Sequence, residues 1–312
     1  MKYVIGIDGG GTKTHLKALD LQRKLVGEAW GGASNLTALS AHQVKQNLEH
    51  LLTGFYDQAG LSPKDCAAVC LGTAGASSDT SQKILTAILA EICPDIPALL
   101  TNDALPILYG NTPSGSGIVL IAGTGSLCMA RDSKGTLWRV GGWGHLIGDE
   151  GSGYHIACRM LNAVMRAFDG RGEQTVLTDF ILEHLALSSP MELVDYVYQS
   201  GNGKRELASL SVLCDKAFAL GDSVAQKIYR EEAANLCEMV ATGAQQLSST
   251  EDGPFLCIYT GGIITKSIPL RHMLCESLRQ KAPEVILQAC SQDAAYGCAL
   301  MALEKQEGRE TV

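Results

Sequence analysis

The chain has 312 residues, of which 46% are hydrophobic and 19% are charged, so it is long enough for two domains with cores of their own. Its formal net charge of -8 and the absence of a Lys/Arg run argue against a nucleic-acid partner. The first residues already follow a strand pattern, and no apolar run reaches about 18 residues, which argues against a secretory signal and a membrane span and favours a cytoplasmic location.

Two glycine-rich turns of nearly the same layout each follow a run of β-forming residues. The first is Asp-Gly-Gly-Gly-Thr at residues 8–12, and the second is Ala-Gly-Thr-Gly-Ser at residues 122–126. After each turn come a strand, a polar corner, a second strand and a pair of glycines. Such turns present backbone N–H groups and hydroxyls with no Cβ in the way. The duplication therefore predicts two related halves that grip a nucleotide in a cleft between them.

The first half begins with three strands and then alternates helices with strands. The apolar spacing predicts strands at 3–7, 15–19, 25–30, 67–71 and 98–101, and helices at 38–59, at 80–92 and from about residue 104. This βββαβαβα order defines a first domain over residues 1–115. It ends in the polar break Ser-Gly-Ser-Gly at residues 114–117.

The second half repeats the three strands and is otherwise rich in helices. We expect strands at 119–122, 127–131, 136–140 and 255–260, and helices at 150–168, 174–187, 191–200, 206–220 and 222–248. The last of these strands meets a third glycine turn, Gly261-Gly262. The second domain spans residues 116–292, and a closing helix at 293–304 packs back on the first domain.

The eleven cysteines are odd in number, scattered and set in apolar surroundings, which predicts reduced core thiols. No Cys-x-x-Cys pair or Cys/His cluster occurs, so the sequence argues against a structural zinc site.

Five motifs occur in a characteristic order: the first glycine turn, Thr-Asn-Asp at 101–103, Gly-Thr-Gly-Ser at 123–126, the block from Gly141 to Gly153, and Gly261-Gly262. Together they resemble the N-acetylglucosamine kinase branch of the BadF/BadG/BcrA/BcrD ATPase family. The resemblance implies an α/β, two-domain actin-like ATPase (ribonuclease H-like) fold with a duplicated βββαβαβα core and an interdomain cleft. It also implies an ATP-dependent kinase that uses Mg²⁺ and takes a small amino sugar as its partner.

Two carboxylates have chemical reasons to act in such a site. Asp103, at the end of a strand, can remove the proton of a sugar hydroxyl during phosphoryl transfer. The alternative is that it only caps the helix beginning near Ala104. Asp8 precedes the phosphate turn and can hold magnesium directly or through water, or it can simply favour the turn.

The resemblance assigns further residues to the two ligands. For the nucleotide they are Gly10, Gly11, Thr12, Gly123, Thr124, Gly125, Gly261 and Gly262. For the sugar they are Asn35, Asp103, Ser126, Gly142, Trp143, Gly144 and Asp149. Two alternatives stay open: Asp149 can act as a cap for the next helix, and Gly261-Gly262 can be a tight turn without a ligand.

One residue departs from the family pattern and one rival function remains. Mammalian-type members have Asn after the second Gly-Thr-Gly-Ser, where this chain has Leu127, so N-acetylmuramic acid and glucosamine are acceptors to consider beside N-acetylglucosamine.

The rival is an ATP-hydrolysing activator of an acyl-CoA dehydratase or reductase. Such an activator holds an iron–sulfur cluster across a dimer, and Cys128 and Cys158 lie in the half of the chain where its ligands would be. Members of the family are often dimers, which makes a homodimer an expectation from the resemblance. His15 and His145 have no carboxylate partner by spacing and are interpreted as structural.

Overall fold

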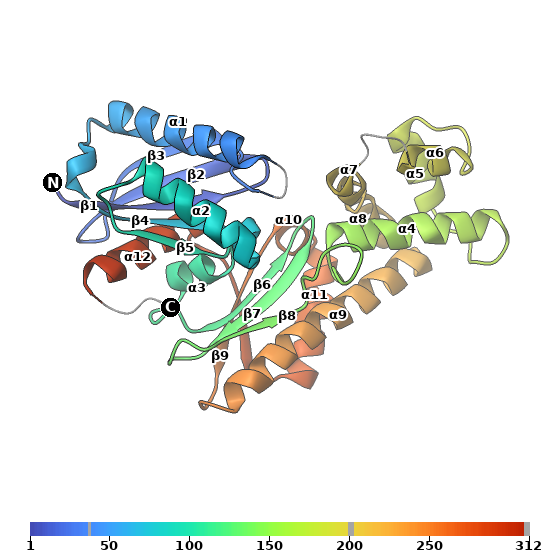
Figure 1. The fold of residues 1–312 in the computed structure, drawn as a ribbon. Coiled ribbons are helices and arrows are strands. Elements are labelled where there is room, and N and C mark those ends of the chain that lie inside the picture. Colours follow the sequence, from blue (N-terminus) through green and yellow to red (C-terminus); the bar gives the residue numbers. More distant parts are fainter. Residues whose placement is uncertain (37–38, 199–202, 309–312) are drawn as a thin grey trace. The chain divides into compact units, whose positions relative to one another are not determined.

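The computed structural model describes residues 1–36, 39–198 and 203–308 and divides the chain into two compact units. Unit 1 contains Met1–Ser116 with Cys290–Val312, and unit 2 contains Gly117–Ala289. Each unit is built on one five-stranded sheet with helices packed against it (Figure 1). The predicted α/β class is confirmed.

The sheet of unit 1 has the strand order β3-β2-β1-β4-β5. β1 pairs antiparallel with β2 and parallel with β4, and β4 pairs parallel with β5. The carboxyl ends of β1, β4 and β5 therefore lie at one edge. The strands are β1 (Tyr3–Gly9), β2 (Lys13–Asp20), β3 (Leu25–Gly32), β4 (Cys66–Thr73) and β5 (Ala98–Thr101).

Helices cover both faces of this sheet, with α1 and α2 on one face and α3 and α12 on the other (Figure 1). α1 starts after a capping box made by Ser40 and Gln43 and ends at Gly60, whose φ of 63° suits glycine. The expected start at residue 38 lies outside the described residues. The helices are α1 (Ala41–Ala59), η1 (Pro63–Asp65), η2 (Ala74–Ser77), α2 (Asp79–Ile92), α3 (Leu105–Asn111) and α12 (Ala294–Gln306).

Alternation along β1 decides which of its side chains meet α12. Tyr3, Ile5 and Ile7 join the core beneath α1 and α2. Gly6 points the other way, where a Cβ would lie 2.1 Å from the Ala295 carbonyl oxygen of α12. Because successive residues of a strand alternate between faces, Asp8 shares the α12 face with Gly6.

The sheet of unit 2 repeats the same plan in the order β10-β9-β6-β7-β8, with β6 antiparallel to β7 and parallel to β9. β10 was not predicted from the sequence. Its five residues follow Pro283 and lack clean alternation, and Ile286 is 53% exposed at the sheet edge. The strands are β6 (Gly117–Ala122), β7 (Ser126–Arg131), β8 (Leu137–Val140), β9 (Phe255–Thr260) and β10 (Val285–Ala289).

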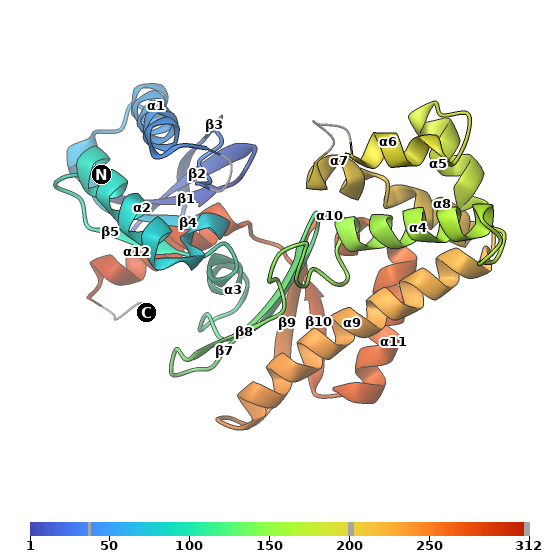
Figure 2. The same cartoon turned by 45° about the vertical axis from the view of Figure 1, so that its right-hand side comes forward.

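The long helix α9 crosses this sheet with α11 beside it, and α4–α8 form a helical group at one end of α9 (Figure 2). The single helix expected at 206–220 is wrong, because the chain breaks between α7 and α8 at Leu210-Ser211. Residue 200, the expected end of another helix, lies outside the described residues. None of the helices in the described part of the chain combines the length and hydropathy that a membrane span requires. The helices are α4 (Gly153–Phe168), α5 (Leu177–Leu185), α6 (Glu192–Tyr198), α7 (Lys204–Ser209), α8 (Val212–Ala219), α9 (Ser223–Ser248), α10 (Gly262–Lys266) and α11 (Ile268–Lys281).

Candidate active site

The first glycine turn joins β1 to β2 and is closed by backbone hydrogen bonds. The Gly10 amide donates to the Lys13 carbonyl at 3.1 Å, and the Ser34 amide donates to the Gly10 carbonyl at 3.1 Å. A Cβ on Gly10 would lie 2.7 Å from the Lys13 carbonyl oxygen, whereas one on Gly11 would meet open space. The turn is thus fixed at its base and exposed at Gly11 and Thr12. The buried residue Asn35 follows Ser34 directly.

Asp8 and Asp103 come together at the carboxyl edge of the unit 1 sheet. The strand register aligns Asp8 with Gly72 and Gly72 with Thr101, and Asp103 follows Thr101 by two residues. The sequence predicted both residues as site residues from chain positions far apart. The sheet topology places them at the ends of β1 and β5, with β4 between the two strands.

Asn102 caps the start of α3. The Asn102 Oδ1 atom accepts hydrogen bonds from the Ala104 amide at 2.9 Å and the Leu105 amide at 2.8 Å. These two amides therefore do not depend on Asp103 for an acceptor. Capping by Asp103 stays an alternative to the catalytic interpretation.

The environment of Asp8 disfavours its negative charge. Burial, followed by the nearby charges of Asp103 and Asp293, raises the pKa of Asp8 to about 6, although Lys13 acts in the opposite direction. Oxygen ligands and excess negative charge fit a magnesium ion. Within the described ranges no three His, Cys, Asp or Glu side chains gather around a metal position. An ion at Asp8 would thus depend on oxygens from a ligand such as a phosphate, which is common for magnesium.

Replacing Asp8 with Asn should stabilise the unliganded protein at pH 8 by about 1–3 kcal/mol. The folded-state pKa of Asp8 is raised, so its ionised form opposes folding above about pH 6, whereas the protonated form dominates in both states below pH 3.8. Denaturant unfolding at pH 8 and pH 3.5 measures the difference, and the gain should vanish at the lower pH. Equal destabilisation at pH 8 and pH 3.5 would show that the ionised Asp8 carboxylate does not oppose folding.

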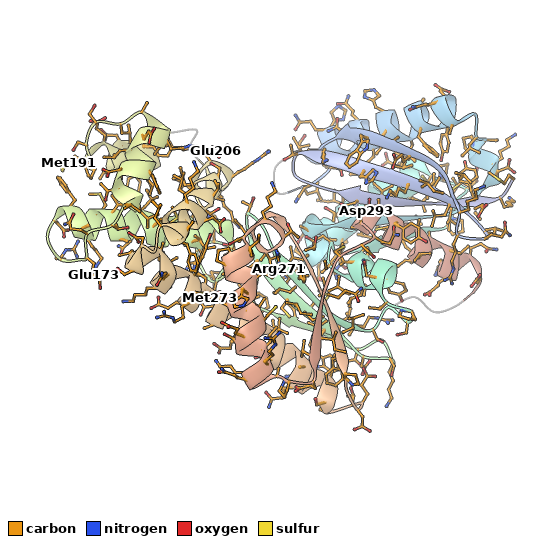
Figure 3. The ribbon with its side chains drawn as sticks, turned by 180° about the vertical axis from the view of Figure 1, so that it is seen from behind. Glu173, Met191, Glu206, Arg271, Met273 and Asp293 are labelled. Carbon is orange, nitrogen blue, oxygen red and sulfur yellow. The ribbon has the colours of Figure 1, made fainter. Side chains whose placement is uncertain are left out.

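His15 pairs with Asp8 across β1 and β2, and it has carboxylate neighbours that were not predicted. It was expected to lack a carboxylate partner, yet its ring nitrogens lie 3.5 Å from Glu28 and 3.5 Å from Asp293. The imidazole also stacks on Trp30 with ring centroids 3.6 Å apart. Asp293 caps α12, since its side chain accepts a hydrogen bond from the Tyr296 amide. Figure 3 labels Asp293 at the start of this helix. These partners come from β3 and α12, so spacing along the chain gave no signal for them.

The second glycine turn is tied to the start of α4 in unit 2. The Gly153 amide donates to the Gly123 carbonyl at 2.8 Å, and the Tyr154 amide donates to the Thr124 carbonyl at 3.3 Å. The Gly123 amide in turn donates to the Gly125 carbonyl at 2.8 Å. The block from Gly141 to Gly153 thus folds back onto the second glycine turn.

Asp149 links this block to the turn. Its Oδ1 atom accepts a hydrogen bond from the Ser126 amide at 3.0 Å, and its Oδ2 atom pairs with Lys204. The N-cap of α4 is Ser152, so the capping alternative for Asp149 is wrong. Lys204 was missed, because it lies 55 residues away in a helix that the sequence did not separate from its neighbour.

Ser126 carries an unsatisfied hydroxyl beside Asp149. The side chain is buried, and its Oγ atom finds no hydrogen-bond partner among the described residues. Buried hydroxyls are normally paired. The Ser126 hydroxyl lies within the second glycine turn and can therefore form a hydrogen bond with a ligand atom or with water.

The third glycine turn packs against the second. Gly261 has a φ of 104°, and a Cβ there would lie 2.4 Å from the Ala122 carbonyl oxygen, so only glycine fits. A Cβ on Gly123 would lie 3.5 Å from the Gly262 amide nitrogen. The two turns predicted for the nucleotide in unit 2 are therefore neighbours.

The loop after β8 brings Gly142 against Leu127. A Cβ on Gly142 would lie 2.8 Å from the Ser126 carbonyl oxygen and 2.9 Å from a Leu127 methyl. Beyond it, Trp143 is 57% exposed with the Arg139 guanidinium 4.6 Å from its ring centroid, and Gly144 has a φ of 94°. The loop thus presents an aromatic face next to Ser126 and Asp149.

One of the two cysteines named for a cluster in the rival function, Cys128, is inaccessible. Cys128 is fully buried in the core of unit 2, and burial raises the pKa of its thiol to about 12. A cluster ligand has to be a thiolate that an iron atom can reach. All eleven cysteines are free thiols, most of them buried. The position of Cys128 therefore argues against the iron–sulfur activator.

The predicted residues thus form two groups, one on each unit. The profile of the BadF/BadG/BcrA/BcrD ATPase family matches residues 5–302, which include both groups. The chain belongs to this family. Membership in the BadF/BadG/BcrA/BcrD ATPase family means that the chain uses ATP, as the sequence predicted.

Two named relatives and one solved structure are similar to nearly the whole chain, and all three are named as sugar kinases. The chain is 37% identical to an N-acetylmuramic acid/N-acetylglucosamine kinase of Clostridium acetobutylicum, over 97% of this chain and 98% of the relative. It is 28% identical to an N-acetyl-D-glucosamine kinase of Dictyostelium discoideum, over 97% and 98%. A Chromobacterium violaceum structure, assigned provisionally to an N-acetylglucosamine kinase, superposes with a TM-score of 0.74 at 26% identity, over 97% and 99%. The predicted family and two-domain fold are confirmed.

Proposed function

We propose that this chain is an ATP-dependent amino-sugar kinase that transfers the γ-phosphate of ATP to the 6-hydroxyl of N-acetylglucosamine or a close relative, N-acetylmuramic acid or glucosamine. The similarity to the Clostridium kinase over nearly the full length of both chains supports the reaction and the substrate class. The observation that carries the mechanism is the pair of carboxylates, Asp8 and Asp103, at one edge of the unit 1 sheet.

Asp103 is the proposed general base. It is half-buried on the segment between β5 and α3, and Asn102 fixes that segment by capping α3. A rigidly placed carboxylate can accept the hydroxyl proton as the oxygen attacks phosphorus, since the alcohol is a poor nucleophile while it retains the proton. The carboxylate therefore has to lie within hydrogen-bond reach of the acceptor hydroxyl.

Asp8 is the proposed magnesium residue. Its raised pKa reflects a buried charge that a cation would neutralise, and carboxylate oxygen is a preferred magnesium ligand. When bound, magnesium would neutralise charge on the ATP phosphates. Asp8 would hold the ion directly or through a water molecule.

The glycine turns are the proposed nucleotide contacts. In unit 1 they are Gly10, Gly11 and Thr12, at a tip that is exposed in the structure. In unit 2 they are Gly123, Thr124 and Gly125 for phosphate, with Gly261 and Gly262 for adenosine. The contact between the second and third turns supports a single nucleotide running across both.

The sugar contacts are proposed from both units. Asn35 and Asp103 lie on unit 1, and Ser126, Gly142, Trp143, Gly144 and Asp149 lie on unit 2. The unpaired Ser126 hydroxyl supports a polar ligand atom at this point. Asp149 can accept from sugar hydroxyls while Lys204 and the Ser126 amide hold it in place. Leu127 packs against Gly142 and adds no polar group at the position where mammalian-type relatives carry Asn.

A phosphoryl-transfer screen tests the function. ATP consumption should be stimulated by N-acetylglucosamine, N-acetylmuramic acid or glucosamine at least about 100-fold more than by glucose, because polar contacts that the acceptor leaves unmade cost affinity and rate. N-acetylmannosamine serves as the stereochemical control. Equal rates with every sugar, or hydrolysis of ATP without any acceptor, would contradict the proposal.

A cytoplasmic location, a homodimer and the absence of nucleic-acid or membrane partners remain predictions. The acidic net charge supports the absence of a nucleic-acid partner. Sedimentation of the purified protein measures the oligomeric state directly.

A further inference from the structure

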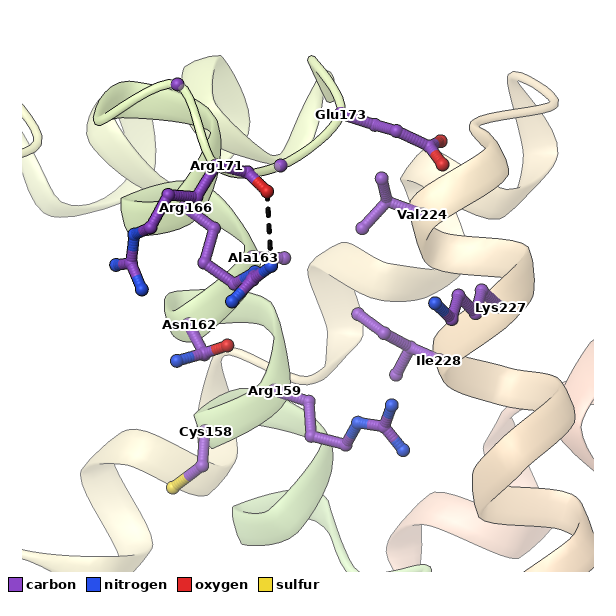
Figure 4. Close-up of a pocket in the computed structure, with 12 residues that line it drawn as sticks. Cys158, Arg159, Asn162, Ala163, Arg166, Arg171, Glu173, Val224, Lys227 and Ile228 are labelled. Carbon is purple, nitrogen blue, oxygen red and sulfur yellow. Dashed lines mark hydrogen bonds between the residues drawn. The ribbon is translucent and has the colours of Figure 1, made fainter.

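Unit 2 contains a pocket of about 620 Å³ between α4, the loop after α4 and the start of α9 (Figure 4). Its volume lies in the range of small-molecule sites. None of its lining residues belongs to the glycine turns or to the proposed sugar contacts. The pocket is therefore a separate feature of the unit.

Four cationic side chains line this pocket, and two of them are already neutralised. Arg159 pairs with Glu231 and with Glu232, the latter at 3.0 Å. Arg171 pairs with Asp169, its Nε atom lying 2.9 Å from Oδ2. These two arginines contribute shape to the pocket more than net charge.

The other two cations form no ion pair among the described residues, although Asp169 lies near enough to Arg166 for their charges to interact. Arg166, on α4, donates to the Arg171 carbonyl at 3.1 Å and forms no ion pair with any residue that the structure describes. Lys227, on α9, likewise forms no ion pair within the described ranges. Figure 4 shows the two side chains coming from helices on either side of the pocket. Arg166 and Lys227 thus present hydrogen-bond donors from facing helices to one anion, with the Glu173 carboxylate also lining the pocket.

The remaining walls give the pocket an apolar side and one anchored acid. Val224 and Ile228 line the pocket from α9, where Val224 lies three residues before Lys227 and Ile228 follows it directly. Glu173 accepts a hydrogen bond from the Ser223 hydroxyl at 2.8 Å, which ties it to the start of α9. An anion with a carbon skeleton can thus contact cations and apolar atoms together.

We propose that this pocket binds a small organic phosphate monoester, with Arg166 and Lys227 holding the phosphate and Val224 and Ile228 contacting the carbon skeleton. A phosphate monoester carries about -1.5 to -2 charges at pH 7, which matches the two cations. Guanidinium and ammonium groups are the usual protein partners of phosphate. The inference does not depend on the proposed kinase activity.

Calorimetric titration of the full chain with N-acetylglucosamine 6-phosphate at low ionic strength tests the site. Arg166→Gln and Lys227→Gln should each weaken binding about 10-fold or more, since each removes one charged hydrogen bond. The matched control is Arg230→Gln. It removes an equal charge from an exposed position on α9, three residues after Lys227, that does not line the pocket. That variant should bind as the wild type does.

Alkylation of Cys158, which lines the pocket, gives a readout located at the site. The sugar phosphate should slow labelling of the peptide containing Cys158, and uncharged N-acetylglucosamine should not. Unchanged affinity in both charge variants, or unchanged Cys158 labelling, would place the ligand elsewhere and overturn the inference. Inorganic phosphate binding as tightly as the sugar phosphate would overturn the role of the apolar side. None of these measurements uses turnover, so a failed kinase assay leaves the test intact.

Discussion

Asp103→Asn should lower the rate of phosphoryl transfer about 10²- to 10⁴-fold while nucleotide affinity stays within a factor of two or so, because the amide cannot accept the hydroxyl proton. The shape of the side chain is preserved, and Asn102 continues to cap α3. Single-turnover kinetics with N-acetylglucosamine and ATP measure the chemical step, and nucleotide titration measures binding.

The control for this prediction is Asp95→Asn, which removes an exposed carboxylate just before β5, whereas Asp103 follows the same strand. It should have wild-type rates. Near-normal turnover in Asp103→Asn would show that Asp103 is not the general base. An equal loss in both variants would instead point to a general effect on unit 1.

Glu232→Ala should lower the free energy of unfolding by about 3–5 kcal/mol, because it removes a buried carboxylate and leaves the buried Gly151 amide and two partly buried cations without their acceptor. Glu232 is fully buried on α9 and accepts from the Gly151 amide at 2.6 Å, His155 Nδ1 at 2.9 Å and Arg159 at 3.0 Å. These contacts hold the segment between Asp149 and α4. Denaturant unfolding measures the change.

Glu231→Ala is the matched control, since it removes the other partner of Arg159 from a half-exposed position. Its effect should be below about 1 kcal/mol. Similar losses in the two variants would show that the buried carboxylate has no special role.

The Glu232 contribution should also depend on pH. Burial alone would raise the pKa of Glu232, but the His155 hydrogen bond, with the other donors, lowers it below its ordinary value of 4.5. The same hydrogen bond raises the pKa of His155 above 6.5. The pair therefore stabilises fully between about pH 4.5 and 6.5. Its contribution falls at lower pH as Glu232 is protonated and at higher pH as His155 loses its proton.

Elements marked by strong local sequence patterns were predicted accurately, whereas elements with weak or continuous patterns were missed. β5 was predicted with its observed bounds, and β9 likewise, because runs of β-forming residues between breaks are local signals. β10 was missed because five residues at a sheet edge give a weak pattern. The break between α7 and α8 was missed because apolar residues continue at helical spacing through it, at Leu207, Leu210 and Leu213.

By itself the sequence determined the duplicated strand–turn–strand units, the positions of the three glycine turns and the placement of Asp8 and Asp103 at strand ends. These are local features, set by residue alternation and by the backbone freedom of glycine. Only the tertiary structure decided that Asn102 caps α3, that Lys204 pairs with Asp149 across 55 residues, and that Glu232 reaches His155 across 77. Periodicity along a chain identifies the face on which a side chain lies, but the partner on the facing element depends on how elements pack, which no local pattern encodes.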